Sequence, residues 1–254
     1  MNTKLEFPDD IRPDFTGFPA STFDFFAGLK KNNDRTWFKA HKHTYDNDVK
    51  FVMECLMAEF SANRRPKGFP VQGDPKRGMF RIYRDVRFSK NKEPYKTHAG
   101  AVLSRTGRKG DPGIIYVHIE PGESFISAGF YSPDKEFLAA WRSRMAAEPD
   151  EFLKLVSPFT KPRNKYFLRH RGALKNMPRG FQEHADSPVA EFIKWKHFLL
   201  GRKITDKQAQ SRKLINLIAE MGDVAEKFLS YGWTIHETAY EDDPRRHMRR
   251  KSGQ

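Results

Sequence analysis

The chain of 254 residues has a single cysteine, and this scarcity limits what can hold the fold together. Cys55 has no second thiol to pair with, so an internal disulfide is excluded and a reducing compartment is expected. No apolar run approaches the roughly 20 residues that cross a bilayer. The first ten residues also lack the apolar stretch of a secretory signal. We therefore expect a cytoplasmic protein that has no membrane partner.

Several motifs of common enzyme classes are also missing. The sequence has no Gly-x-x-x-x-Gly-Lys-Ser loop, no Gly-x-Gly-x-x-Gly, no Gly-x-Ser-x-Gly, no His-Glu-x-x-His and no cysteine pair. These absences argue against the usual forms of nucleotide hydrolysis, dinucleotide redox chemistry, serine hydrolysis and zinc proteolysis. No helix-turn-helix or aromatic–basic RNA-binding signature stands out either. We expect no cofactor.

Positive charge, by contrast, is abundant and unevenly placed, and the formal net charge is +14. Residues 76–109 carry a net charge of +9, residues 161–179 carry +7 and residues 245–251 carry +5. The remainder of the chain is therefore net acidic. Such concentration suggests an anionic partner, which would be a phosphate-bearing small molecule or a nucleic acid.

Hydrophobic periodicity predicts the organisation of the chain. We expect an N-terminal arm at 1–19, a single α+β domain at 20–240 with helices packed on an antiparallel sheet, and a basic, disordered tail at 241–254. Helices are predicted over residues 21–31, 37–60, 132–147, 149–157 and 205–231. Strands are predicted over residues 98–104, 113–120, 124–131 and 166–169, and a helix followed by a strand fits 192–203. Ser21 should cap the first helix and Gly232 should end the last.

The segment 80–96 is the most informative part of the sequence, because it alternates as a strand does. Its apolar side chains would share one face: Phe80, Ile82, Val86 and Phe88. Arg84 would lie in the middle of that face. A guanidinium in an apolar stripe is costly unless a carboxylate or a bound anion meets it. The pattern therefore predicts an anion site.

In this interpretation Arg84, Arg87 and Lys92 converge on the anion, because a guanidinium forms two parallel charge-assisted hydrogen bonds and lysine adds a point charge. Asp85 would orient an arginine or act as a base. The predicted ligand-binding residues are Arg81, Arg84, Asp85, Arg87, Lys92, Tyr95 and Lys175. Tyr95 would donate a hydrogen bond, and Lys175 would come from the second basic segment. The alternative is an internal ion-pair network in which Arg84 meets a carboxylate elsewhere: Glu120, Asp34 or Asp48.

The same segment resembles a bacterial family described only as a domain of unknown function, family 2461. The resemblance rests on an Arg-x-x-Arg-Asp-x-Arg-Phe run with Asn, Lys and Tyr downstream: Arg81, Arg84, Asp85, Arg87, Phe88, Asn91, Lys92 and Tyr95. Stretches at 33–45, 117–133 and 174–181 are also similar to the family. Together they span roughly residues 18–235, which implies one domain. The family carries no established activity, so the resemblance marks residues and implies no reaction.

A second group of candidates lies on the predicted strand 113–120. His118 and Glu120 share a face there and could form an acid–base pair or a metal pair, although no third ligand stands at a recognisable spacing, so we expect no metal site. The candidate catalytic residues are Asp85, His118 and Glu120. Four functions remain open: binding of a phosphate-bearing ligand, nucleic-acid binding, a phosphoester-processing enzyme, and a plain interaction domain in which the motif is scaffold.

Overall fold

The structure is a computed structural model, and it describes residues 12–64, 70–161, 164–170 and 172–240. The predicted tail at 241–254 and most of the predicted N-terminal arm lie outside these residues. The chain divides into two compact units, which we describe separately. The first comprises the residues up to 127 together with 202–223, and the second comprises 128–201 together with the residues from 224 onward.

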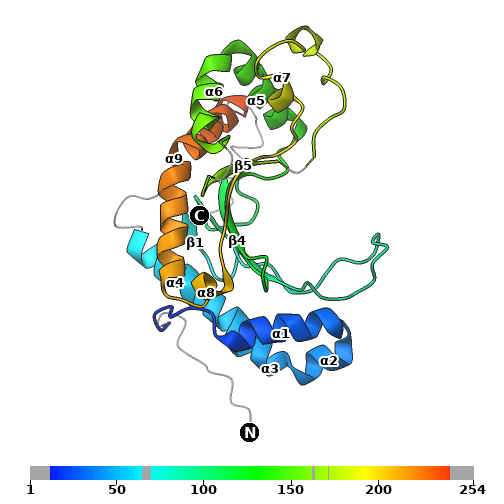
Figure 1. The fold of residues 1–254 in the computed structure, drawn as a ribbon, viewed down its shortest axis with the longest axis vertical. Coiled ribbons are helices and arrows are strands. Elements are labelled where there is room, and N and C mark those ends of the chain that lie inside the picture. Colours follow the sequence, from blue (N-terminus) through cyan, green and yellow to red (C-terminus); the bar gives the residue numbers. More distant parts are fainter. Residues whose placement is uncertain (1–11, 65–69, 162–163, 171, 241–254) are drawn as a thin grey trace. The chain divides into compact units, whose positions relative to one another are not determined.

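The strands form one antiparallel sheet with the order β1-β2-β3-β4-β6-β5, and helices make up most of the rest, so the predicted α+β class is confirmed (Figure 1). The strands are β1 (Gln72–Gly73), β2 (Ala99–Ser104), β3 (Ile114–Ile119), β4 (Phe125–Phe130), β5 (Phe167–Arg169) and β6 (Phe198–Lys203). β2 and β3 form a hairpin whose register pairs Gly100 with His118. The predicted strands 98–104, 113–120, 124–131 and 166–169 all correspond to observed ones.

The first unit contains several helices, and four of them overlap the region predicted as a single helix over 37–60. They are α1 (Ala20–Lys31), α2 (Arg35–Ala40), α3 (Lys42–Thr44), a π-helix (Tyr45–Phe51), α4 (Val52–Arg64) and α8 (Asp206–Ala209). The second unit holds α5 (Lys135–Ala147), α6 (Pro149–Val156) and α7 (Ala190–Ile193), with 3₁₀ turns at Ser157–Phe159 and Gln182–His184. α9 (Lys213–Ala239) begins in the first unit and ends in the second. No helix among the described residues is long and apolar enough to cross a membrane.

Four helix predictions were wrong in detail. The helix predicted over 205–231 is split into α8 and α9, with residues 210–212 outside either helix. The helix predicted over 37–60 is interrupted at His41, whose backbone (φ −107°, ψ 11°) is not helical and whose ring stacks on Trp37 at 3.9 Å. Ser21 does not cap α1, because its hydroxyl donates to Asp48 and the N-cap position is Pro19. Gly232 does not end α9, which continues to Ala239.

Gly232 lies inside α9, where its lack of a side chain allows close packing against aromatic rings. A Cβ at this position would lie 2.2 Å from the Phe130 ring and 2.4 Å from the Trp141 ring. Trp141 is fully buried, stacks on Phe198 at 4.5 Å and forms the aromatic core of the second unit with its neighbours. The glycine therefore allows α9 to approach these rings within the helix rather than at its end.

The strand predicted from residue 80 is also wrong. Within 80–96 the ladder is limited to a single bridge between Tyr83 and Tyr95, flanked by bonds from Arg84 N to Pro94 O and from Lys96 N to Ile82 O. Local side-chain bonds take the place of a longer ladder. The Asp85 carboxylate accepts from the Arg87 N–H, and the Asn91 amide oxygen accepts from the Glu93 N–H. Such bonds compete with strand pairing, so the segment is an irregular loop, which we call the motif loop (residues 82–95).

The β2–β3 hairpin has two chemically different faces. Its odd-numbered residues are apolar and buried: Ala99, Ala101, Leu103, Ile115, Val117 and Ile119. The opposite face carries Tyr116, His118 and, just beyond the strand ends, His98 and Glu120. Because successive side chains of a strand alternate between faces, one face supplies core and the other presents polar chemistry. We call His98, Tyr116, His118 and Glu120 the polar face.

Candidate functional site

Arg84 lies in the motif loop, and it is neither deeply buried nor without a partner. Its Nη1 donates to the Glu93 carbonyl oxygen at 3.2 Å and to the Glu93 carboxylate at 3.4 Å, and 26% of the side chain is exposed. The expected apolar stripe around it does not form, since Phe88 is 95% exposed. The predicted buried guanidinium is therefore wrong, and its carboxylate partner is Glu93 rather than a residue from another element.

The other basic motif residues are also engaged within the loop. Arg87 makes two bonds to the Asp85 carboxylate, at 3.0 and 2.8 Å, and these bonds lower the pKa of Asp85 and raise that of Arg87. Lys92 Nζ donates to the Val86 carbonyl oxygen at 3.0 Å. The loop thus satisfies much of its own charge.

Tyr95 is positioned for packing. Its side chain is only 5% exposed and stacks on Phe38 at 4.2 Å, while its backbone exchanges two hydrogen bonds with the side chain of Asn33. The loop is therefore fastened to the segment before α2 at this residue. Lys175 belongs to the second unit, in the segment after β5, and its role stays a prediction.

A different group of cations has backbone carbonyl partners but no carboxylate partner among the described residues. Lys96 Nζ donates to the Arg81 carbonyl oxygen at 2.7 Å, and Lys109 Nζ donates to the Met79 carbonyl oxygen at 2.9 Å. Both ammonium groups lie over the Phe80 ring, at 5.5 and 5.4 Å from its centroid. Among the described residues no carboxylate lies within ion-pair distance of Arg81, Lys96 or Lys109. We call these three the cationic group.

The charges of this group act on one another. Burial lowers the pKa of the half-buried Lys96, and the like charges of Arg81 and Lys109 lower it further. Of the three, only Arg81 was among the predicted ligand-binding residues. Lys96 and Lys109 lie on opposite sides of β2 in the sequence, and the fold brings their ammonium groups to the same ring.

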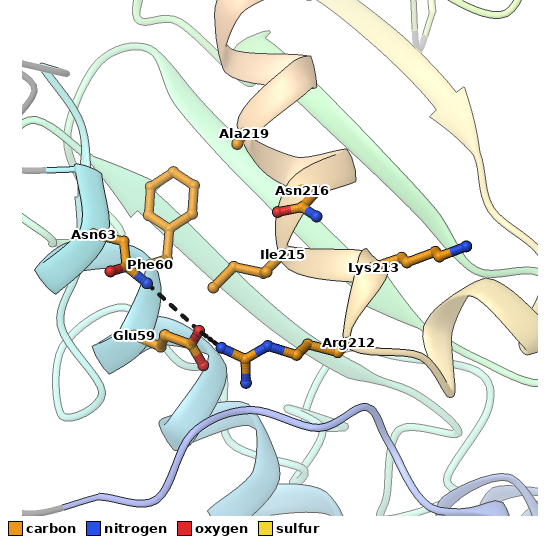
Figure 2. Close-up of a pocket in the computed structure, with 8 residues that line it drawn as sticks. All are labelled: Glu59, Phe60, Asn63, Arg212, Lys213, Ile215, Asn216 and Ala219. Atoms are coloured by element: carbon orange, nitrogen blue, oxygen red, sulfur yellow. Dashed lines mark hydrogen bonds and ion pairs between the residues drawn. The ribbon is translucent and has the colours of Figure 1, made fainter.

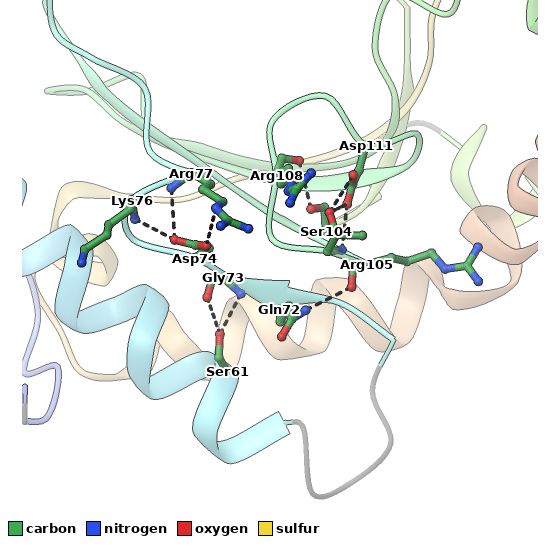
Figure 3. A network of polar contacts seen from close by, with 11 residues as sticks. Ser61, Gln72, Gly73, Asp74, Lys76, Arg77, Ser104, Arg105, Arg108 and Asp111 are labelled. Carbon is green, nitrogen blue, oxygen red and sulfur yellow. Dashed lines mark hydrogen bonds and ion pairs between the residues drawn. The ribbon is translucent and has the colours of Figure 1, made fainter. Parts of the chain in front are cut away.

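The loop that carries Lys109 is held by its own polar contacts (Figure 3). The Asp111 carboxylate accepts from the Thr106 N–H at 2.7 Å, and the Ser104 hydroxyl donates to the Arg108 carbonyl oxygen at 3.0 Å. In the neighbouring loop after β1, the Asp74 carboxylate likewise fixes the backbone, because it accepts from the Lys76 and Arg77 N–H groups. Lys109 therefore projects from a loop whose backbone is already fixed.

The polar face adjoins the cationic group. The Phe80 ring meets the Tyr116 ring edge-on at 5.9 Å, and the charge of Lys96 contributes to lowering the pKa of His98. A Cβ at Gly100 would lie 2.6 Å from the Tyr116 hydroxyl, so the glycine leaves the space in which the phenol lies. Two groups of residues with complementary chemistry are thus neighbours in the first unit.

Within the polar face the side chains form a chain of hydrogen bonds. The Tyr116 hydroxyl lies 3.1 Å from His118 Nδ1, His118 Nε2 lies 2.9 Å from a Glu120 carboxylate oxygen, and Thr97 Oγ1 donates to the other Glu120 oxygen at 3.2 Å. His118 is buried and stacks on Phe125 at 4.5 Å. Such an arrangement can hold or move a proton between an imidazole and a carboxylate.

His98 completes this cluster and was missed from the sequence. Its ring lies 4.2 Å from that of His118, and burial, with a smaller contribution from His118, lowers its pKa to about 4. A signal for it was present. When 98–104 pairs antiparallel with 113–120 so that Gly100 is opposite His118, His98 necessarily comes opposite Glu120. The statement that no third ligand accompanies His118 and Glu120 is therefore corrected.

A cavity of about 460 Å³ between α4 and the first turns of α9 is a weaker candidate (Figure 2). Its guanidinium, Arg212, lies 2.6 Å from the Glu59 carboxylate and 3.4 Å from that of Asp14, and it donates to the Phe15 carbonyl oxygen at 3.0 Å. Because two carboxylates and a carbonyl oxygen already meet Arg212, this contact fastens the segment before α1 to α4 and α9.

The comparison with protein families gives one match. The family model described as a conserved hypothetical protein (DUF2461) matches residues 21–231, so the chain belongs to this family. No curated protein and no solved structure matches the chain. The resemblance inferred from the motif is confirmed, and the site has to be judged on its own geometry.

Proposed function

We propose that this protein binds a phosphate-bearing anionic ligand at the cationic group of Arg81, Lys96 and Lys109. The observation that supports the proposal is the contrast between these cations and the two arginines of the motif loop. The first have no carboxylate partner among the described residues, whereas Arg84 is paired with Glu93 and Arg87 with Asp85. The proposal moves the anion from Arg84, Arg87 and Lys92 to their neighbours, and keeps Arg81.

The chemistry of the three side chains suits a phosphate group. The like charges of Arg81 and Lys109 both act on Lys96, and a dianion would relieve that repulsion. A guanidinium supplies a planar pair of N–H donors, while ammonium groups supply point charges. The Phe80 ring, which is 36% exposed, offers an apolar surface for the organic part of a ligand.

The test is ligand-induced stabilisation of the metal-free protein, measured as the shift of the thermal unfolding midpoint. Inorganic phosphate, pyrophosphate, a nucleoside monophosphate and a sugar phosphate form the panel, with chloride as the reference. A ligand at 100 times its dissociation constant adds about 2.7 kcal/mol. We expect at least one phosphate compound to stabilise the wild type, and Arg81→Ala and Lys109→Ala to reduce that shift.

Arg87→Ala is the matched control, because Arg87 is an exposed cation already bonded to Asp85. It should leave the shift unchanged. The proposal fails when no compound of the panel stabilises the wild type, or when Arg87→Ala lowers the shift as much as Lys109→Ala does.

Nucleic-acid binding is the second candidate, and one observation favours it. Phe88 is almost fully exposed in the motif loop, with the Arg87 guanidinium 5.8 Å from its ring centroid. Exposed aromatic rings beside cations are used for stacking on unpaired bases. Binding of single-stranded DNA or RNA with a steep salt dependence, weakened by Phe88→Ala, would favour this candidate over the small ligand.

A phosphoester-processing enzyme is the third candidate, supported by the His118–Glu120 contact beside the cationic group. It requires a reaction as well as binding. A screen of phosphatase and nuclease substrates, with and without Mg²⁺ or Mn²⁺, separates it from the first two. In each of the three cases we place the protein in the cytoplasm, on the basis of its single thiol.

A further inference from the structure

The polar face brings together three side chains of the types that bind transition metals: His98, His118 and Glu120. One ligand atom from each can be chosen so that all lie within 4.8 Å of one another, and no other such trio occurs among the described residues. We propose that these three residues bind a divalent transition-metal ion, with Zn²⁺ as the type case. The inference goes beyond anion binding and does not depend on it.

The strand pairing explains why the trio is preformed. His98 directly precedes β2 and Glu120 directly follows β3, each next to the last paired residues Ala99 and Ile119, so both lie at the same end of the hairpin. His118 lies two residues before Glu120 and therefore on the same face of the strand. Ligands on paired strands need little ordering when a metal binds.

The distances require only side-chain adjustment. Ligand atoms about 2.0–2.2 Å from a tetrahedral Zn²⁺ lie roughly 3.4 Å apart. His118 Nε2 and the Glu120 oxygen are already 2.9 Å apart, and all atoms of the trio are within 4.8 Å. The set of two imidazoles and one carboxylate leaves a fourth position open, which is typical of catalytic rather than structural zinc.

The contacts around the trio match the outer contacts of metal sites. Imidazole ligands usually donate their second N–H to an acceptor, and ligating carboxylates are themselves hydrogen-bonded. Here Tyr116 contacts His118 Nδ1 at 3.1 Å, and Thr97 donates to the Glu120 oxygen that His118 does not contact, at 3.2 Å. Without metal, His118 Nε2–H donates to Glu120. When metal binds Nε2, the proton is carried on Nδ1, where the Tyr116 oxygen accepts it.

The neighbouring cations are expected to lower the affinity of the three residues for a metal ion. Arg81, Lys96 and Lys109 repel an incoming cation, whereas the Glu120 carboxylate attracts it. We therefore expect binding weaker than that of structural zinc sites. For the same reason a bound metal would attract an anion to its open position.

The experiment is a Co²⁺ titration of the untagged, chelator-stripped protein in phosphate-free buffer, followed by Zn²⁺ competition. We expect one equivalent of Co²⁺ with the intense visible absorption of tetrahedral coordination, and its displacement by Zn²⁺. His98→Ala and Glu120→Gln should each weaken binding by more than roughly 100-fold, and Tyr116→Phe by roughly 10-fold, as expected for an outer contact. His43→Ala is the control, because His43 is exposed on α3 and its ring contacts the neighbouring Asn47 side chain on the same helical run.

Two results overturn the inference: no saturable Co²⁺ or Zn²⁺ binding by the wild type, or binding that survives in the His98→Ala/Glu120→Gln double variant. Because His118 packs against Phe125, its substitution is avoided, and thermal unfolding confirms that each variant is folded. Lys109→Ala should retain the metal. This variant separates failure of the metal site from failure of the anion site.

Discussion

The motif loop and the cationic group are two basic regions of the same unit, and they differ in whether their positive charges have carboxylate partners. In the motif loop Arg84 meets Glu93 and Arg87 meets Asp85. In the cationic group, among the described residues, Lys96 and Lys109 contact carbonyl oxygens and an aromatic ring rather than carboxylates. The number of basic residues is therefore a poor guide to an anion site. What matters is whether the fold supplies the counter-charge.

The difference follows from how each region is assembled. The ion-paired residues of the motif loop, Arg84 with Glu93 and Arg87 with Asp85, are at most nine residues apart in sequence. A short segment therefore supplies the counter-charges of its own arginines. The cationic group draws on segments around residues 80, 96 and 109, which the bridge between Met79 and Ala101 and the β2–β3 hairpin hold in place. Locally made contacts can satisfy charge as the loop forms, whereas distant segments are brought together by the sheet.

The largest expected effect comes from making the cationic group resemble the motif loop. Lys109→Glu places a carboxylate beside Lys96 and Arg81, which should weaken phosphate binding by roughly 10-fold or more because a favourable charge becomes a repelling one. Isothermal titration with the stabilising compound measures this change. Lys90→Glu, an exposed charge reversal in the motif loop, should have a much smaller effect. Equal losses in the two variants would remove the distinction between the regions.

The reverse change makes the motif loop resemble the cationic group. Glu93→Gln removes the carboxylate that meets Arg84, whose side chain is partly exposed. Solvent screening limits the expected loss to about 0.5–1 kcal/mol of unfolding free energy, measured by chemical denaturation. Asn91 also bonds this carboxylate, at 2.8 Å, so Asn91→Ala serves as the comparison. A loss above about 2 kcal/mol would mean that Arg84 is a structural anchor.

A smaller effect is expected at the exposed pair of the motif loop. Arg87 hydrogen bonds lower the pKa of Asp85, so Arg87→Ala should raise that pKa toward its ordinary value. A carboxyl-carbon NMR titration follows Asp85 directly. In the wild type Asp85 stays ionised to lower pH, and in the variant it takes up its proton at higher pH. An unchanged titration curve would show that the pair does not persist in solution.

The smallest effect on stability is expected at Phe88. Because its ring is 95% exposed, Phe88→Ala should change the unfolding free energy by no more than about 0.5 kcal/mol. Chemical denaturation measures this value. Tyr95→Ala, which removes a buried ring from the same loop, provides the contrast and should be clearly destabilising. A large loss for Phe88→Ala would place its ring against another surface.

Much of the fold could be predicted from local patterns. Sequence patterns identified β2, β3, β4 and β5, and the helix predicted over 132–147 is observed as α5, with Asp134 accepting from the Phe137 N–H as its cap. These features depend on neighbours in sequence. The motif loop failed as a strand because side-chain bonds such as Asp85 to Arg87 N–H outcompete pairing.

The candidate site was only partly predictable. His118 and Glu120 were recognised because they alternate on one strand, and Arg81 because it lies in the motif. Lys96 and Lys109 were not selected, since nothing near them in sequence marks their role, and the signal for His98 lay only in the pairing of two strands. Their importance arises from a sheet register and from the absence of nearby carboxylates, which are properties of the assembled chain.

The amino-acid sequence by itself determined the α+β class, the family, most strands and the abundance of positive charge, because period, turn chemistry and composition are local quantities. The tertiary structure alone decided that Lys96 and Lys109 have no carboxylate partner among the described residues, since an ammonium is satisfied by whatever group lies within a few ångströms, however distant along the chain. It also placed His98 across from Glu120, because strand pairing joins residues that the sequence keeps apart.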